Sequence, residues 1–204
     1  MEALAQRFDE VDKSAQYAEL AHTARGSFNR IFWNEEIGCL YDCINGELRD
    51  ASIRPNQLFA ISLPHSVLAE ERQRQALDIV AQHLLTPFGL RSLSPSDEKY
   101  IGHYGGIPYH RDSAYHQGTV WAWLIGPFIT AYMKVNGKTA DAREAARGYL
   151  TALTTHVKEA GVGSISEIFD GDPPHTPRGC IAQAWSVAEV LRAYVEELCE
   201  KHST

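Results

Sequence analysis

The spacing of apolar residues along the chain predicts a mainly helical protein. Apolar side chains recur every three or four positions between Ser14 and Phe32, and Ser14 is a suitable N-cap for a helix over that range. The residues from Ser66 to Leu85 place an apolar face opposite a charged one, as an amphipathic helix does. The same pattern predicts helices from about Thr139 to Ala160 and from about Cys180 to Lys201.

A nearly continuous apolar segment, from about Thr119 to Val135, predicts a buried helix at the centre of the fold. The segment is shorter than the roughly 20 apolar residues that cross a bilayer. The net charge of −7 offers no basic surface for nucleic acid or an anionic membrane, so we expect neither partner. Because the N-terminus lacks a secretory pattern and the four cysteines are too sparse for a disulfide scaffold, we expect a cytoplasmic protein with reduced thiols.

Turn residues predict two shorter elements. Asn45-Gly46, placed after a β-prone run, is a strong signal for a small β-hairpin. Pro55 is tolerated in the first turn of a helix and opens a short helix through about Leu63. In a chain of 204 residues with 44% hydrophobic residues, these elements predict one domain over residues 1–204.

Two long loops concentrate polar and aromatic side chains. The first, from Thr86 to Thr119, has roughly thirty residues, which is uncommon in a compact domain unless the loop has a function. Its tyrosines and histidines could stack on the faces of a sugar and bond its hydroxyls, or pack the loop against the domain. His110, Asp112 and His116 could also ligate a metal, but no compact metal motif accompanies them. We expect no metal.

The second loop, from Gly161 to Gly179, carries three acidic residues. An inverting glycosidase uses one carboxylic acid to protonate the leaving oxygen and one carboxylate to activate water. Glu167 is the better candidate for the base because apolar residues flank it. Asp170 and Asp172 sit in a Gly-Pro turn, where turn capping is the commoner role. A salt bridge from Glu167 to Arg178 is the structural alternative.

Five short segments identify a protein family far more specifically as an ordered set than any one of them does alone. Arg54-Pro55-Asn56-Gln57 by itself, for example, could simply cap a helix. They are Arg54-Pro55-Asn56-Gln57, Gly89-Leu90-Arg91-Ser92-Leu93, Tyr115-His116-Gln117-Gly118-Thr119-Val120-Trp121, Ser166-Glu167-Ile168-Phe169-Asp170-Gly171 and Gly179-Cys180-Ile181-Ala182-Gln183-Ala184-Trp185-Ser186. Together they resemble the C-terminal glucosidase domain of glycogen-debranching enzymes, over residues from about Phe32 to Arg192.

The resemblance implies an all-α (α/α)6 toroid, of which this chain would form about half, with a small β-hairpin. It implies inverting release of glucose from α-1,6-linked stubs of a branched α-glucan or limit dextrin, without metal or organic cofactor, and Glu167 as the general base. The implied glucose site contains Arg54, Asn56, Gln57, Asp112, His116, Gln117 and Trp121, with Tyr109 as a further candidate.

The sequence departs from the family pattern in two places. The family's general acid lies upstream in a Trp-Met-Asp segment that this sequence lacks. Because acid catalysis typically contributes about 10²–10⁴-fold, we expect the isolated chain to be nearly inactive. Ala122 replaces the family's proline between two tryptophans, which affects local geometry and not the fold.

A half ring would expose the apolar side of its inner helices, so we expect self-association or pairing with an upstream half-domain. Two other functions remain open. A noncatalytic saccharide-binding or assembly module on the same half-toroid would bind dextrin without releasing glucose. Another toroid enzyme, such as a sugar epimerase, would act on different substrates, because a fold does not fix a function.

Overall fold

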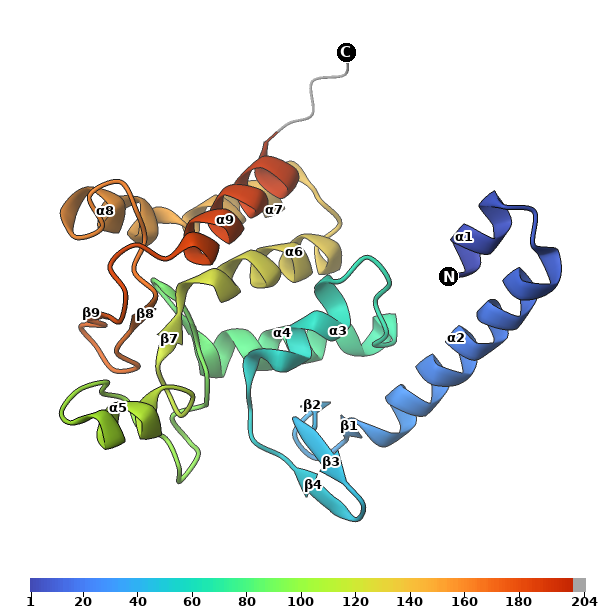
Figure 1. Cartoon of the computed structure of the whole chain (residues 1–204), viewed down its shortest axis with the longest axis horizontal. Helices are drawn as coiled ribbons and strands as arrows, with labels where there is room; N and C mark the ends of the chain where they lie inside the picture. Colours follow the sequence, from blue (N-terminus) through green and yellow to red (C-terminus); the bar gives the residue numbers. More distant parts are fainter. Residues whose placement is uncertain (200–204) are drawn as a thin grey trace.

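The computed structural model describes residues 1–199, which form helices joined by short strands (Figure 1). The helices are α1 (Glu2–Arg7), α2 (Val11–Ile31), α3 (Phe59–Ser62), α4 (Glu70–Leu84), α5 (Pro108–Ala114), α6 (Ile125–Val135), α7 (Ala140–Gly148), α8 (Thr151–Glu159) and α9 (Ala184–Ala193). Two 3₁₀ turns, η1 (Pro55–Leu58) and η2 (Ala122–Leu124), precede α3 and α6, and a π turn, η3 (Tyr194–Leu198), follows α9. The prediction of a mainly helical chain is confirmed.

Helix α6 is the central helix that its apolar sequence predicts. It packs against α3, α4, α7 and α9. Its side chains Phe128, Ile129 and Met133 are completely buried. Burying one such side chain stabilises a fold by about 1.5–3 kcal/mol. The helix thereby fixes the position of the segment that precedes it, which carries Trp121.

A five-stranded antiparallel sheet, which the sequence pattern did not predict, joins the two long loops. Its strands, in spatial order, are β5 (Leu85–Thr86), β6 (Gly89–Arg91), β7 (Val120–Trp121), β8 (Ile168–Phe169) and β9 (Pro177–Arg178). Trp121 lies opposite Leu90 on one side and Ile168 on the other. Gly89 permits the close approach of β6, because a Cβ there would lie 2.4 Å from the Trp121 carbonyl oxygen. The sheet therefore brings the segment around Glu167 beside Trp121.

The predicted hairpin is present, and a further strand pair lies just before it. Strands β3 (Cys43–Asn45) and β4 (Leu48–Asp50) pair with Asn45 opposite Leu48, so the chain reverses at Gly46, where φ is +62°. Strand β1 (Trp33–Asn34) pairs with β2 (Cys39–Leu40). The predicted short helix after Pro55 is also confirmed, as η1 followed by α3.

Several predicted helix limits are wrong. The helices predicted from Ser14, Ser66, Thr119 and Cys180 begin at Val11, Glu70, Ile125 and Ala184, and Val120–Trp121 forms strand β7 instead. The single helix predicted from Thr139 to Ala160 is two helices, α7 and α8. The backbone N–H groups of Tyr149 and Leu150 bond carbonyls three residues back, which tightens the end of α7 before α8 begins. The predicted helix end at Lys201 lies outside the described residues.

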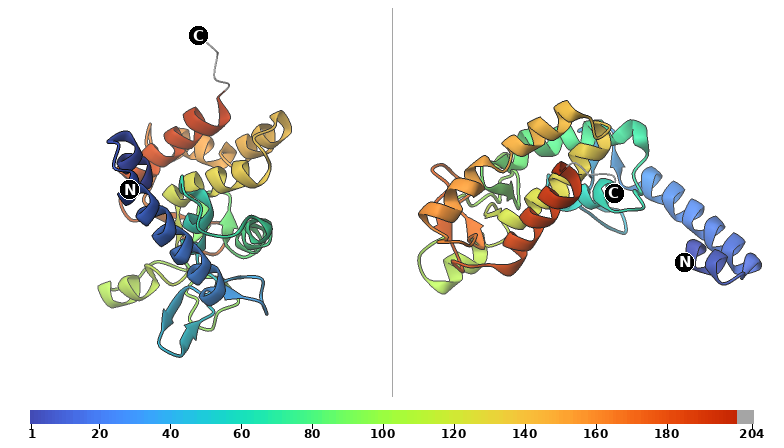
Figure 2. Two further views of the ribbon diagram at one scale, coloured as in Figure 1. Left: turned by 90° about the vertical axis from the view of Figure 1, so that its right-hand side faces the viewer. Right: turned by 90° about the horizontal axis from the view of Figure 1, so that it is seen from above.

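Helices α1 and α2 form an arm that stands away from the rest of the protein, as Figure 1 and the right view of Figure 2 show. The main contacts of α2 are with α1 and β1. Leu20 on α2 is 57% exposed, and Ser14 is its buried residue. The predicted helix is therefore present, but within residues 1–199 no core covers most of its apolar side chains.

Candidate functional site

A pocket of about 600 Å³ lies between the β3–β4 hairpin, η1, the residues before α6 and the start of α9. Its volume falls within the range of small-molecule sites, roughly 300–1,000 Å³. It is lined by Asp42, Asp50, Arg54, Pro55, Asn56, Ser92, His116, Gln117, Trp121, Trp123, Leu124 and Trp185. Arg54, Asn56, His116, Gln117 and Trp121 are site residues predicted from the sequence, and the fold brings these five together.

One wall of the pocket is aromatic. The His116 ring stacks on Trp121 with centroids 5.3 Å apart and ring planes 1° apart. Trp185 meets Trp121 edge-on at 6.4 Å and stacks on Trp123 at 5.9 Å. Aromatic faces of this kind provide apolar surface with fixed geometry. The wall is suited to the C–H face of a sugar ring.

Arg54 holds the polar wall together. Its Nη1 donates to the carbonyl oxygens of Ser92 at 3.0 Å and His116 at 2.8 Å, and its Nη2 donates to Gln117 Oε1 at 2.8 Å. Its Nε lies 3.8 Å from Asp42 Oδ2. Most of the guanidinium donors are therefore used within the protein. Arg54 fixes the hairpin and the His116-Gln117 segment relative to each other.

Asp42 is a pocket carboxylate that the sequence analysis missed. Its Oδ1 accepts a hydrogen bond from Asn56 Nδ2 at 2.7 Å, and its Oδ2 faces Arg54. A carboxylate has about four acceptor positions, so some remain for hydroxyl groups of a ligand. Asp42 stands just before the hairpin and belongs to no recognisable sequence motif. Its place in the pocket follows only from its contacts with Arg54 and Asn56.

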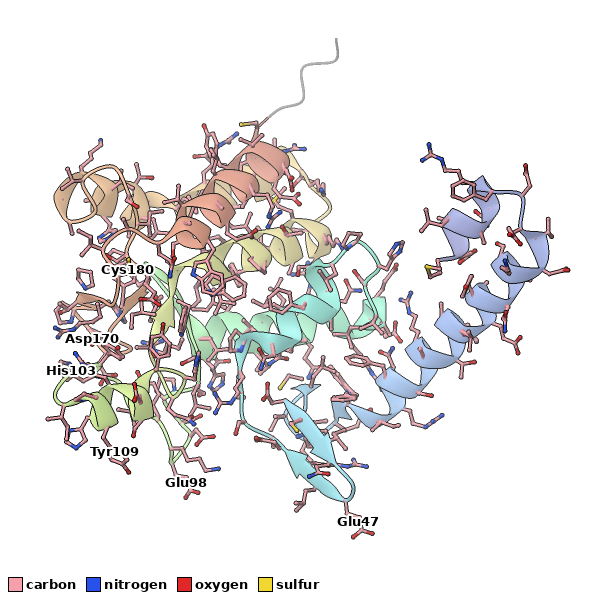
Figure 3. The ribbon with its side chains drawn as sticks, in the orientation of Figure 1. Glu47, Glu98, His103, Tyr109, Asp170 and Cys180 are labelled. Carbon is pink, nitrogen blue, oxygen red and sulfur yellow. The ribbon has the colours of Figure 1, made fainter. Side chains whose placement is uncertain are left out.

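Four predicted site residues do not line this pocket within the described part of the chain: the catalytic candidate Glu167 and the glucose-site candidates Gln57, Asp112 and Tyr109. Gln57 is 6% exposed, accepts the Leu40 N–H at 3.4 Å and donates to the Arg54 carbonyl at 3.3 Å, so it links β2 to the start of η1. Asp112 and Tyr109 lie on the exposed surface of α5. Tyr109 is 73% exposed and points away from the protein (Figure 3).

Glu167 lies just before β8, half-buried, and both of its carboxylate oxygens are held. The Tyr115 hydroxyl donates to Oε1, and the Cys180 N–H donates to Oε2 at 2.9 Å. Gly179 makes room for the carboxylate, because a Cβ there would lie 2.5 Å from Oε2, and its φ of +67° favours glycine. The alternative salt bridge from Glu167 to Arg178 is not formed, since Arg178 pairs with Asp170.

Tyr115 links Glu167 to the aromatic wall. Its ring meets Trp121 edge-on with centroids 4.8 Å apart, and it contacts the His116 ring at 4.9 Å. Burial raises the pKa of the Tyr115 phenol well above its ordinary value, and the hydrogen bond to Glu167 raises that pKa further. The phenol therefore stays protonated at neutral pH and acts as a donor to Glu167.

Comparison with known proteins assigns the chain to a family. A family model described as amylo-α-1,6-glucosidase matches residues 1–192. The chain belongs to the amylo-α-1,6-glucosidase family. It is 29% identical over 166 residues to the glycogen debranching enzyme of Saccharomyces cerevisiae, and the match covers 72% of this chain but 11% of the yeast protein. The chain therefore spans a small part of that relative's length.

The family match confirms the resemblance inferred from the five ordered segments and extends it. The match begins at residue 1, whereas the resemblance began at about Phe32. The residues matched by the family model therefore include the arm formed by α1 and α2.

In this amylo-α-1,6-glucosidase domain, the prediction that Asp170 caps a turn is wrong. Asp170 is 5% exposed, and Arg178 bonds it through Nη2 at 3.0 Å. His103 Nδ1 lies 3.2 Å from its Oδ2, and the Tyr104 N–H donates to its Oδ1 at 2.8 Å (Figure 3). Asp170 thus ties the first long loop to β8 and β9. A buried acid of this kind cannot be distinguished by sequence from a turn acid.

Asp172 stays in the predicted turn and adds a second link to the first loop. Its carbonyl accepts the His175 N–H at 2.9 Å, and its carboxylate accepts from the Tyr100 hydroxyl at 2.9 Å. Burial, followed by the bond to Asp172, raises the pKa of Tyr100 to about 12. The two links hold together the loops that carry Tyr115 and Glu167.

The remaining predictions concern metals and membranes. Within residues 1–199, no group of three or more His, Cys, Asp or Glu side chains is arranged to hold a metal ion, so His110, Asp112 and His116 do not form such a group. Among the described helices, none has the length and apolar character that a membrane crossing requires.

Proposed function

We propose that this chain supplies the general base and much of the glucose pocket of an inverting amylo-α-1,6-glucosidase, which releases glucose from α-1,6-linked stubs on branched α-glucans. The observation that carries the proposal is Glu167, held on both oxygens and joined through Tyr115 to an aromatic and polar pocket. Membership of the family supports the class of reaction, and the yeast relative is named for glycogen debranching.

In the proposed reaction, a water oxygen attacks the anomeric carbon while Glu167 takes a proton from that water. The bond from the anomeric carbon to the glycosidic oxygen breaks, and a second carboxylic acid protonates the leaving oxygen. Attack from the face opposite the α-linkage gives β-glucose. We propose that the acid comes from the family's upstream Trp-Met-Asp segment, which this sequence lacks.

The chemistry of the pocket supports a neutral sugar as its ligand. Trp121 and His116 offer stacked aromatic surface, and Asp42 and Gln117 offer acceptors to hydroxyl groups. Arg54 is neutralised by Asp42 and engaged with carbonyl groups, so among the described residues that line the pocket there is no free cation that would select an anionic substrate.

A larger hollow of about 1230 Å³ lies between α2 on one side and α4 and α6 on the other. Within residues 1–199, its lining includes one carboxylate, Glu70, and no Phe, Tyr or Trp side chain, which does not suit a glycosidase site. We propose instead that this hollow, like the uncovered arm, receives helices of an upstream half-domain. The large share of the yeast relative outside the match supports a partner of that kind.

The outer face of α9 supports the same partner. Trp185 and Leu191 within α9 are exposed by 51 and 59%, and Ile181 before it and Val195 after it are exposed by 73 and 53%. Trp185 also lines the pocket, so a half-domain covering α9 would reach the site and could bring the acid to it. We propose that the two halves form the (α/α)6 toroid of a cytoplasmic enzyme.

Glucose release from a phosphorylase limit dextrin tests the proposal. The assay compares this chain alone, this chain with a polypeptide carrying the upstream half, and the same mixture with Glu167→Gln. We expect release in the mixture and its loss with Glu167→Gln. Glu98→Gln, in an exposed acid outside the pocket (Figure 3), is the matched control and should retain activity.

Two results would contradict the proposal. Release by this chain alone would show that one of its own carboxyls serves as the acid. Tight binding of the dextrin by the mixture, without release of glucose, would favour the noncatalytic saccharide-binding module in place of an enzyme.

A further inference from the structure

The surroundings of Glu167 go beyond what a general base alone requires. Oε1 accepts from the Tyr115 hydroxyl, Oε2 accepts from the Cys180 N–H at 2.9 Å, and the Glu167 N–H donates to the Cys180 carbonyl at 2.9 Å. Gly179 packs closely against the carboxylate, where a Cβ would lie 2.5 Å from Oε2. Two bonds leave further lone pairs on the carboxylate free for a water molecule. The orientation of the carboxylate is therefore set by a hydrogen bond to each of its two oxygens.

Tyr115 is itself held in place. Its carbonyl accepts from Thr119 Oγ1 at 2.5 Å and from Trp121 Nε1 at 3.2 Å. Its ring packs against Tyr104 at 5.7 Å as well as against His116 and Trp121. A donor fixed in this way loses little conformational entropy when it bonds a carboxylate. The phenol can therefore impose a direction on Glu167.

We propose that Tyr115 is the positioning residue of Glu167: its hydroxyl, together with the Cys180 amide, fixes the carboxylate in the orientation that accepts a proton from the attacking water. The inference rests on the proposed function, because it assumes that Glu167 is the base. Tyr115 acts through Glu167 and not on the sugar. Loss of the hydroxyl should therefore lower kcat and leave KM nearly unchanged, since misplacement of a reacting group mainly affects the chemical step.

The test uses α-D-glucosyl fluoride and the mixture of this chain with the upstream half. Water forms a bond to the anomeric carbon, fluoride leaves with the electron pair of the C–F bond, and Glu167 takes the proton. Tyr115→Phe keeps the ring and removes the hydroxyl. We expect kcat to fall by about 10- to 100-fold and KM to change by less than about twofold. Tyr109→Phe, which removes a hydroxyl from a side chain that is 73% exposed and outside the pocket, is the matched control and should change neither.

A second background shows whether Tyr115 acts through Glu167. In Glu167→Ala, azide added to the solution can attack the anomeric carbon without a base, and β-glucosyl azide and fluoride are the products. If Tyr115 only positions Glu167, adding Tyr115→Phe to Glu167→Ala leaves the azide-dependent rate within about twofold. A purely structural role would lower this rate as well, because a disturbed pocket would bind the sugar poorly.

The outcomes separate the two ideas. Unchanged kcat in Tyr115→Phe, or an azide-dependent rate that falls by the same factor as kcat, would overturn the positioning role while Glu167 remains the base. Full activity of Glu167→Ala without azide, or no fluoride release by the unsubstituted mixture, would overturn the proposed function and this inference with it.

Discussion

Replacing Arg54 by alanine tests whether this side chain holds the pocket together. The substitution removes three hydrogen bonds, to the carbonyls of Ser92 and His116 and to Gln117 Oε1, and leaves the Asp42 carboxylate without its cation. The Arg54 side chain is 18% exposed, so solvent compensates only in part. At about 1 kcal/mol net for each bond, the free energy of unfolding should fall by about 3 kcal/mol. For a domain of this size, Tm should fall by about 6–12 °C.

Denaturation in guanidinium chloride measures this free energy directly. Arg30→Ala is the control, because Arg30 is exposed on α2, and its free energy of unfolding should change by less than about 0.5 kcal/mol. Arg54→Lys should recover only part of the loss, since an ammonium lacks the planar fork that reaches several acceptors. A loss below about 0.5 kcal/mol for Arg54→Ala would refute the role of Arg54 as the link between the hairpin and the His116-Gln117 segment.

Three further predictions concern stability, pH and association. Asp170→Asn should lower the free energy of unfolding by about 2 kcal/mol, because it removes the negative charge that pairs with Arg178 at a buried position. Asp172→Asn, at an exposed position, should lower it by less than about 1 kcal/mol, and thermal melting of the two variants checks the difference. Desolvation lowers the pKa of buried His156 in the folded chain, so the unfolded chain binds more protons, and stability falls as the pH drops below the ordinary histidine pKa of about 6.5. His156→Gln should flatten that dependence in urea titrations, and an unchanged slope would exclude His156 as its source. Leu191→Asp on the outer face of α9 should weaken self-association in sedimentation velocity more than Leu48→Asp on the hairpin does, and equal effects would argue against α9 as the contact.

Local features of the fold were predictable from the sequence because they depend on neighbouring residues. The run of apolar residues that forms α6 and the Asn45-Gly46 reversal each carry their signal within a short segment. The five-stranded sheet was not predictable, because its strands have two or three residues and cannot show a period of two. Its pairings join segments that lie far apart in the sequence, Leu90 with Trp121 and Trp121 with Ile168.

For the candidate site, the sequence predicted several of the pocket residues but not their individual contacts. Arg54, Asn56, His116, Gln117 and Trp121 belong to the segments that carry the family resemblance, and all five line one pocket. The partners of individual side chains were not predictable. The bond from Tyr115 to Glu167, the place of Asp42 and the burial of Asp170 all depend on how distant loops pack. No local sequence pattern encodes these contacts.

The anomeric form of the first glucose released tests most directly whether Glu167 is the general base of an inverting glucosidase. Proton NMR can follow the reaction of α-D-glucosyl fluoride with the mixture of this chain and the upstream half before mutarotation mixes the anomers. We predict β-glucose as the first product and, in Glu167→Gln, a rate lower by about 10²–10⁴-fold. If α-glucose appeared first, or Glu167→Gln released glucose as fast as the unsubstituted chain, Glu167 would not be the base of an inverting reaction.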